Sequence, residues 1–396
     1  MKKRRLLLLF AVCLLALSLV ACGDDGDMQD HYPPASEGLR FTEHDTYCEL
    51  SGIGSCEDTD IVIPESYNGL PVTGIGIGAF FRNATITSVR IPDSVAIIGL
   101  RAFEECDSLA SVTIDGGTTV IDGNAFARCT GLTSLEMGEG VTAIGDWAFT
   151  GCANLTSVTI PDSVTTVGYG AFSKCYDLAS VTISSGMTVI ADEMFSSCYG
   201  LTSITIPDGV TTIAYKAFSE CINLSNVEIP DSVTTIGKEA FAYTPLTSVT
   251  IPDGATTLDN AVFYGCAGLK SVTIPDSVTF FGSSMFSECT GLTEVIIGDG
   301  VTVIDDYTFY NCTSLTSVVI PEGVTAIGYK AFYGCRNLAE ITMPKSIISI
   351  GGWGFWDCGS LKTVCYLGSK EDWEKIEMSG GNLALEWIDV HYEGES

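Results

Sequence analysis

The pattern of apolar and polar positions along this chain repeats every 23 residues. In the copy from Ala148 to Gly168, Leu155, Val158 and Ile160 are apolar, and the residues on either side of Val158 are polar. Alternation of this kind predicts a short β-strand with one buried face. Pro161 and the Asp-Ser pair after it favour a turn, because proline presets φ and the polar side chains bond local amides.

The second half of the unit is expected to return to the same core. Val164 and Val167 should point inward, and Tyr169–Cys175 should form a single helical turn. Six large apolar side chains per coil stabilise it by roughly 9–18 kcal/mol. Ordering 23 residues costs more than that, at ~1–2 kcal/mol per residue of backbone. One repeat is therefore one coil of a solenoid that is stable only when neighbours share a core.

A phenylalanine marks every copy of the repeat. Thirteen of them are 23 residues apart, except for one spacing of 22 between Phe241 and Phe263. The column is Phe80, Phe103, Phe126, Phe149, Phe172, Phe195, Phe218, Phe241, Phe263, Phe286, Phe309, Phe332 and Phe355. We predict a repeat solenoid of parallel β-strands with short helical or irregular turns, about 13 coils over residues 79–364, with the phenylalanines as an internal ladder.

Both ends need caps, since an open end would expose core and strand edges. Residues 39–78 form the expected N-terminal cap, with Asp60–Pro64 as a degenerate first strand. Residues 365–396 form the C-terminal cap, in which Ser369 should be the N-cap of a short helix and Val390–Tyr392 a final strand. The expected buried anchors of this cap are Trp373, Ile376 and Trp387.

The repeat reads approximately A-F-x-x-C-x-x-L-T-S-V-T-I-P-D-S-V-T-T-I-G and resembles the BspA-like, or treponemal-type, leucine-rich repeats of bacterial surface proteins. The resemblance covers residues from about 60 to 365. It implies a leucine-rich-repeat horseshoe or straighter solenoid that serves adhesion or other surface recognition. It implies no catalysis and no cofactor, and it brings no universal binding residues to this sequence.

The N-terminus predicts export. Residues 2–5 are basic and residues 6–20 are almost wholly apolar, a run too short for a comfortable membrane span. Leu19–Gly23 resembles the lipobox of bacterial lipoproteins, which implies a signal peptide over residues 1–21 and lipidation of Cys22. An ordinary secretory signal is the alternative. Residues 22–38 are acidic and interrupted by prolines, so we expect a flexible tether to a bacterial cell surface or outer membrane.

The negative net charge of the chain argues against nucleic acids and anionic membranes as binding partners. The chain has 49 acidic and 19 basic residues, a formal charge of −30. Nucleic-acid binding needs clustered lysine and arginine, so we expect no nucleic-acid partner, and contact with a membrane only through the lipid anchor. Three histidines leave little room for His-dependent catalysis.

Eleven of the 16 cysteines stand three residues after a repeat phenylalanine, and Asn83 and Thr244 take this position in two coils. Because all three residue types are small and form hydrogen bonds, we expect the column to face inward and satisfy backbone groups. A disulfide ladder is the alternative, and the absence of close Cys pairs or histidines in the repeats argues against zinc. Cys48 and Cys56 could form a disulfide in an exported protein. The column is Cys106, Cys129, Cys152, Cys175, Cys198, Cys221, Cys266, Cys289, Cys312, Cys335 and Cys358.

Aromatic residues in the last coils are the best candidates for a binding surface. An aromatic stripe suits protein hot spots or stacking on sugars, and packing between coils is the alternative. An apolar spot in a Ser- and Thr-rich outward face adds two further candidates; that face is either a soluble sheet surface or a hydroxyl-rich binding surface. The candidates are Tyr310, Tyr333, Trp356, Tyr307, Tyr329 and Trp353 in the stripe, and Ile296 and Val319 in the spot.

Acidic residues follow the strand in nearly every coil, where turn chemistry explains them and calcium is the alternative. Paired carboxylates could also serve a glycosidase, but these acids recur at equivalent positions, as a scaffold requires. We therefore predict a non-enzymatic, metal-free and surface-anchored recognition module for host or environmental protein ligands. A glycan-binding component of a nutrient-acquisition system is the alternative.

Overall fold

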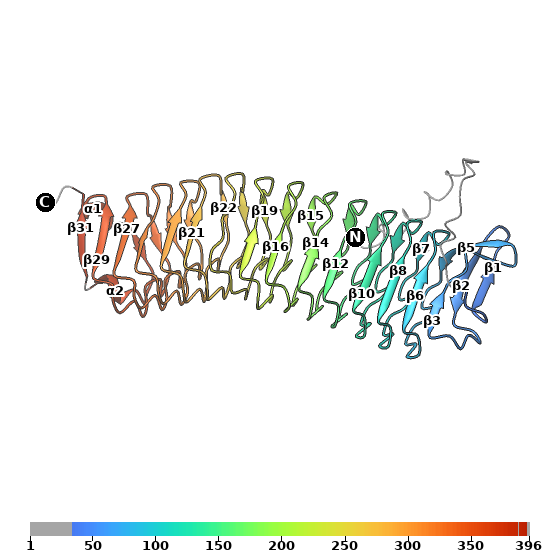
Figure 1. The fold of residues 1–396 in the computed structure, drawn as a ribbon. Helices are drawn as coiled ribbons and strands as arrows, with labels where there is room; N and C mark the ends of the chain where they lie inside the picture. The colour runs from blue at the N-terminus through green and yellow to red at the C-terminus, as the bar shows by residue number, and fades with distance from the viewer. Residues whose placement is uncertain (1–33, 387, 394–396) are drawn as a thin grey trace. The chain divides into compact units, whose positions relative to one another are not determined.

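The computed structural model describes residues 34–386 and 388–393. From Ala35 onward, successive coils of chain stack in sequence order, from β1 in blue to β31 in red in Figure 1. The predicted parallel β-solenoid is confirmed. The predicted signal peptide, Cys22, most of the tether and Trp387 lie outside the described residues.

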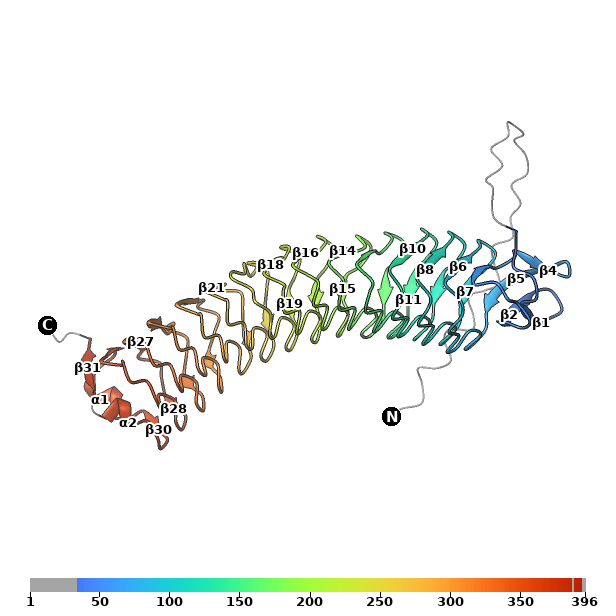
Figure 2. The ribbon, with the colours of Figure 1, turned by 60° about the horizontal axis from the view of Figure 1, so that its bottom comes forward.

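All coils but one contribute a longer strand to a row that we call the long-strand row (Figure 2). In the remaining coil, Ser248 forms only an isolated parallel bridge with Ser271. Paired strands are parallel and offset by one repeat, as where Ser111 lies beside Ser134. Their apolar residues point inward, and Val112 is 1% exposed. The row contains β6 (Ser88–Ile91), β8 (Ser111–Ile114), β10 (Ser134–Met137), β12 (Ser157–Thr159), β14 (Ser180–Thr182), β16 (Ser203–Thr205), β18 (Asn226–Glu228), β21 (Ser271–Ile274), β23 (Glu294–Ile297), β25 (Ser317–Val319), β27 (Glu340–Pro344) and β29 (Thr363–Leu367).

A second row of two-residue strands, the short-strand row, was not predicted as strand. Two residues are too few to show the alternation by which a strand is recognised in a sequence. The row contains β7 (Ile97–Ile98), β9 (Val120–Ile121), β11 (Ala143–Ile144), β13 (Thr166–Val167), β15 (Val189–Ile190), β17 (Thr212–Ile213), β19 (Thr235–Ile236), β20 (Thr257–Leu258), β22 (Phe280–Phe281), β24 (Val303–Ile304), β26 (Ala326–Ile327), β28 (Ser349–Ile350) and β30 (Glu377–Met378).

The six residues before each position of the cysteine column form what we call the turn segment. The helical turn predicted for Tyr169–Cys175 is wrong: this stretch consists of tight turns in which Gly170 and Lys174 have φ of 58° and 59°. Left-handed residues at both positions cannot continue a right-handed helix. The backbone instead bonds to the next coil, where the N–H of Phe172 donates to the carbonyl of Met194 at 3.0 Å.

The repeat phenylalanines fill the centre of the stack. All thirteen are at most 2% exposed. Adjacent ring centroids are 4.9–6.0 Å apart and adjacent ring planes differ by 1–16°. Each ring between Phe80 and Phe355 therefore packs against the rings of both neighbouring coils, and these two end rings pack against one, so the interior is shared along the solenoid.

The N-terminal end departs from the repeat. Its strands are β1 (Arg40–Glu43), β2 (Cys48–Gly52), β3 (Asp60–Val62), β4 (Ser66–Tyr67) and β5 (Leu70–Ile75). The antiparallel pair β1–β2 continues through β5 into the short-strand row, and β3 pairs with β6 as expected for a degenerate first strand. Ser36 is buried and its N–H donates to the carbonyl of Val62 at 2.9 Å. The packed fold thus begins before Gly38, the predicted end of the tether.

The C-terminal end contains α1 (Lys370–Trp373), α2 (Leu383–Glu386) and β31 (Asp389–Tyr392). The hydroxyl of Ser369 accepts the N–H of Asp372 at 3.2 Å, which is the predicted N-cap. Ile376 is 8% exposed, and the ring of Trp373 meets that of Tyr366 edge-on at 5.2 Å. Strand β31 pairs with β29. None of the helices in the described ranges is long and apolar enough to cross a membrane.

Candidate functional site

The column cysteines are buried hydrogen-bond donors. Each Sγ donates to the carbonyl of the phenylalanine in the preceding coil, at 3.0–3.3 Å. Burial raises the pKa of Cys106 and Cys175 to about 12. These thiols are therefore poor nucleophiles at neutral pH, and the column is structural.

No disulfide joins the cysteines of the described residues. In the N-terminal cap, Cys48 is buried in β2 and its Sγ points toward the carbonyls of Leu70 and Pro71 at 3.7 and 3.5 Å. Cys56 is half-buried. In this structure both cysteines are free thiols, and the thiol of Cys48 is directed at backbone oxygens.

The six aromatic candidates gather on the turn segments of three consecutive coils; we call this group the aromatic patch. The rings of Tyr310 and Tyr333 stack with centroids 5.2 Å apart. Trp353 and Trp356 meet edge-on at 4.7 Å and are 41% and 38% exposed. Tyr307 contacts both Tyr310 and Tyr329.

Lys330 completes the aromatic patch and was not among the predicted residues. Its Nζ lies 5.2 Å from the ring centroids of Tyr329 and Tyr333 and 5.9 Å from that of Tyr307. Such cation–π contacts fix the lysine against the rings. Lys330 is one repeat after Tyr307 and one before Trp353, so its place in the patch could have been found from the period.

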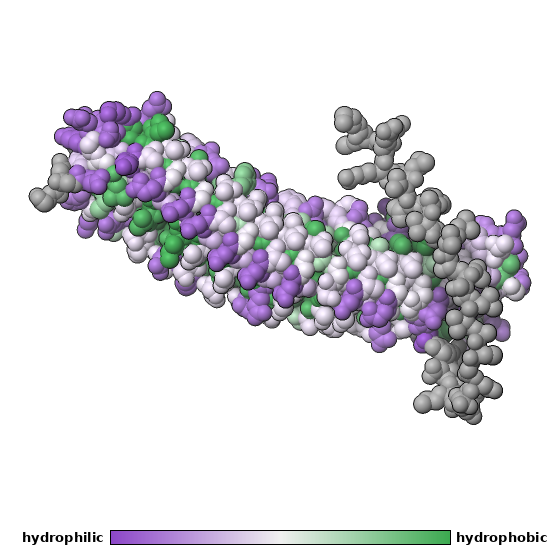
Figure 3. Space-filling model, turned by 90° about the horizontal axis from the view of Figure 1, so that it is seen from above, coloured by the Kyte–Doolittle hydropathy of each residue, from purple (hydrophilic) through white to green (hydrophobic). Residues whose placement is uncertain are grey.

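Ile296 and Val319 are exposed, at 54% and 63%, but they belong to β23 and β25 of the long-strand row. The structure therefore places them outside the aromatic patch. Figure 3 shows one face of the molecule, on which apolar residues are scattered except toward the C-terminal coils, where they gather. Scattered apolar residues are normal on a protein surface, whereas a gathered group marks a contact site.

A further stacked pair, Tyr176 and Tyr199, was missed. Their centroids are 4.9 Å apart, and Tyr176 is 40% exposed. Both stand four residues after a repeat phenylalanine, so a search of every outward column would have found them. This pair lies on coils outside the aromatic patch.

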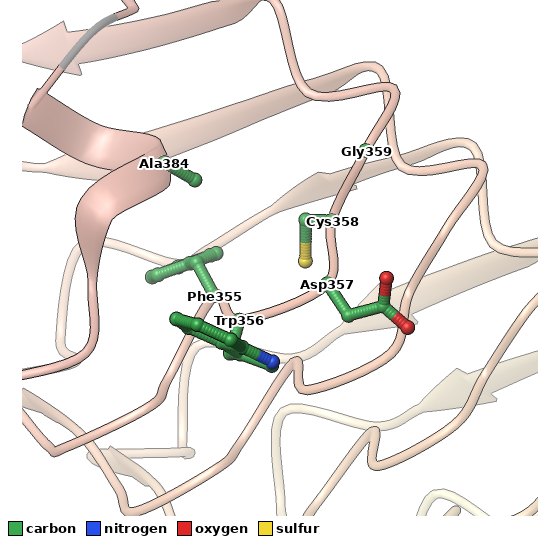
Figure 4. Close-up of a pocket in the computed structure, with 6 residues that line it drawn as sticks. All are labelled: Phe355, Trp356, Asp357, Cys358, Gly359 and Ala384. Atoms are coloured by element: carbon green, nitrogen blue, oxygen red, sulfur yellow. The ribbon is translucent and has the colours of Figure 1, made fainter.

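A pocket adjoins the aromatic patch at the last coil. It has a volume of about 330 Å³ and is lined by Phe355, Trp356, Asp357, Cys358, Gly359 and Ala384. In Figure 4, Ala384 on α2 faces Phe355 and Trp356, and the carboxylate of Asp357 turns away from them. That carboxylate accepts the Nε of Arg336 at 2.8 Å.

Carboxylates of the strand-end turns accept backbone N–H groups of the next coil. Asp162 accepts the N–H of Ser185 at 2.8 Å, and this bond lowers the pKa of Asp162. Asp276 accepts the N–H of Asp299 in the same way. Within the described ranges, no group of three or more His, Cys, Asp or Glu side chains is placed to hold a metal ion.

The repeat region matches a known family. The family described as "BspA type Leucine rich repeat region (6 copies)" matches residues 73–202, 188–316 and 302–377, which together exceed half of the chain. The chain belongs to this BspA-type family. A search of curated proteins gave no match.

Several solved structures of bacterial proteins resemble this one. A leucine-rich repeat protein from Bacteroides ovatus is 29% identical, with a TM-score of 0.74, over 91% of this chain and 99% of its own. A leucine rich cell surface protein from Faecalibacterium prausnitzii is 30% identical, with a TM-score of 0.51, over 87% and 98%. The pneumococcal vaccine antigen PcpA, at 16% identity and a TM-score of 0.51 over 91% and 98%, shares the fold alone.

Proposed function

We propose that this BspA-type protein is a non-enzymatic recognition module on a bacterial surface, which binds a protein ligand through the aromatic patch. The patch carries the proposal, because it brings six tyrosine and tryptophan rings and one lysine together on three coils. Tyrosine and tryptophan dominate the hot spots of protein interfaces. The Faecalibacterium relative, described as a cell surface protein, supports the proposed location.

The geometry of the rings favours a protein over a glycan. Sugars stack on open ring faces, but Tyr310 and Tyr333 are within 17° of parallel and cover one face of each other. Part of the ring surface of Trp353 and Trp356 is likewise covered, because these two rings contact each other. These mutual contacts reduce the ring face that is open to a sugar and leave hydroxyl and indole N–H groups for the mixed polar and apolar contacts of a protein interface.

The test is to probe arrays of extracellular proteins and of glycans with the chain from residue 22 onward. The variant Tyr310→Ser/Tyr333→Ser/Trp356→Ser should bind a captured protein at least about tenfold more weakly, since hot-spot residues contribute most of the affinity. The residues are half-buried or exposed, so the variant should keep its melting temperature within a few degrees.

The matched control is Tyr176→Ser/Tyr199→Ser, which removes a stacked pair of the same type outside the aromatic patch. It should bind as the wild type does. An unchanged isotherm for the patch variant would contradict the proposal, and capture of glycans alone would favour the alternative function.

We also propose that the protein reaches the surface as a lipoprotein anchored at Cys22. The basic and apolar stretches of residues 2–20 and the lipobox-like Leu19–Gly23 support this. The acyl chains would hold the solenoid at the membrane, because each buried CH₂ contributes ~0.8 kcal/mol.

A further inference from the structure

The last coil lacks the neighbour that every earlier coil has. In the twelve coils before it, the N–H two residues after the repeat phenylalanine donates to a carbonyl of the next turn segment. The last such bond runs from the N–H of Gly334 to the carbonyl of Trp356, at 2.8 Å. The equivalent donor of the final coil is the N–H of Asp357, and no further coil follows.

The C-terminal cap satisfies only part of this open edge. The N–H of Trp353 donates to the carbonyl of Gly380 at 3.0 Å, and the N–H of Phe355 donates to Oδ1 of Asn382 at 3.1 Å. The N–H of Asp357 has no acceptor among residues 34–386 and 388–393. Backbone N–H groups form hydrogen bonds with carbonyl oxygens wherever one is in reach. The earlier coils show the bond that the N–H of Asp357 would make with a carbonyl placed beside it.

The open donor belongs to a residue that lines an apolar pocket. Trp356 and Ala384 present carbon surface to it above the buried Phe355, and the carboxylate of Asp357 points away from that surface (Figure 4). The thiol of Cys358 is engaged with the carbonyl of Phe332 at 3.1 Å. The pocket can therefore take an apolar side chain next to the backbone donor.

The negative net charge of the chain favours a positively charged partner. The chain carries a formal charge of −30, and its field attracts positively charged proteins and repels acidic ones. We propose that this pocket docks a main-chain segment of a basic partner protein. A carbonyl of the segment accepts the N–H of Asp357, and an apolar side chain packs on Trp356. The inference rests on the proposed function and names the chemistry of its ligand.

The test uses the chain from residue 22 onward, labelled with ¹⁵N, and three capped tripeptides: acetyl-Lys-Leu-Lys-amide, acetyl-Ser-Leu-Ser-amide and acetyl-Glu-Leu-Glu-amide. The basic peptide should shift the amide signal of Asp357 and the indole signal of Trp356 and slow hydrogen exchange at Asp357. Affinity should fall from the basic to the neutral to the acidic peptide, and added salt should weaken the basic one most.

Two glycine-to-leucine variants test whether the peptide binds at the pocket. Gly359 belongs to the pocket lining, and a Cβ there would meet no atom within 4 Å, so Gly359→Leu adds bulk beside the pocket without a clash and should weaken the basic peptide at least about tenfold. Gly380→Leu is the control, because a Cβ there is equally free and lies outside the pocket lining. It should leave the affinity unchanged.

The inference is overturned if no peptide moves the Asp357 amide, if the acidic peptide binds as well as the basic one, or if both leucine variants behave alike. The docking at Asp357 and the proposed function can be rejected independently of each other. Docking at Asp357 together with protein capture that is unaffected by Tyr310→Ser/Tyr333→Ser, a variant that leaves Trp356 of the pocket lining in place, would reject the aromatic patch as the ligand site and keep the pocket.

Discussion

At the scale of the residue, one position of the repeat combines packing with hydrogen bonding. Cys175 is fully buried, and its Sγ donates to the carbonyl of Phe149 at 3.3 Å. In the coil that is one residue shorter, the hydroxyl of Thr244 donates to the carbonyl of Phe241 at 2.8 Å. The buried copies of this position therefore hold a small donor, whereas the half-buried Asn83 of the first coil accepts the N–H groups of Thr85 and Ile86. A thiol supplies the donor with the least polar surface.

Cys175→Ala removes the donor and leaves the carbonyl of Phe149 without this partner. The carbonyl of Phe149 still accepts the N–H of Cys152 at 3.3 Å, so the free energy of unfolding should fall by about 0.5–1.5 kcal/mol, the net value of one hydrogen bond. Cys175→Ser keeps a donor and should lose less. Urea unfolding of both variants checks this, and an alanine variant as stable as the serine variant would show that the bond is unimportant.

At the scale of the element, the buried thiols of the cysteine column together determine how the free energy of unfolding changes at alkaline pH. Burial raises the pKa of Cys106, Cys175 and Cys221 to about 12 and that of Cys266 to about 11, from an ordinary value of 9.0. The protonated thiol is thus favoured in the folded chain. Its contribution is complete below pH 9 and is lost as the pH rises toward the folded values.

The melting temperature should accordingly be flat near neutral pH and fall steeply above pH 9. Each buried thiol adds a slope of about 1.4 kcal/mol per pH unit in that window. Thermal melts across the window measure the effect. Cys175→Ser should have a shallower decline than the wild type, and parallel curves would mean that the thiols are not its cause.

The strand and the two inward columns were predictable because the same residue types recur at one spacing in every coil. The turn was not, because the left-handed conformation at Lys174 is a property of φ and is not signalled by glycine. The rings of the aromatic patch followed from the period. The open donor at Asp357 did not, since it depends on where the last coil ends.

At the scale of the whole molecule, the proposed lipid anchor determines where the solenoid is displayed. Cys22→Ser should abolish incorporation of a labelled fatty acid and release the exported protein from the membrane fraction, because the acyl chains attach at that sulfur. Labelling followed by fractionation measures both. Unchanged labelling would contradict lipidation at Cys22, and a change of location without any labelling of the wild type would point to another anchor.

Each coil has left-handed residues on both sides of its phenylalanine, such as Arg101 and Glu105, or Trp147 and Gly151. For most L-residues this conformation costs about 1–2 kcal/mol, less for asparagine and aspartate and more for β-branched residues, so the fold depends there on the path of the backbone. Arginine, tryptophan, glutamate and lysine all occupy such positions. Outward residues at these places can mutate freely while the interior stays intact, which would let one ancestral scaffold diversify its contacts without refolding.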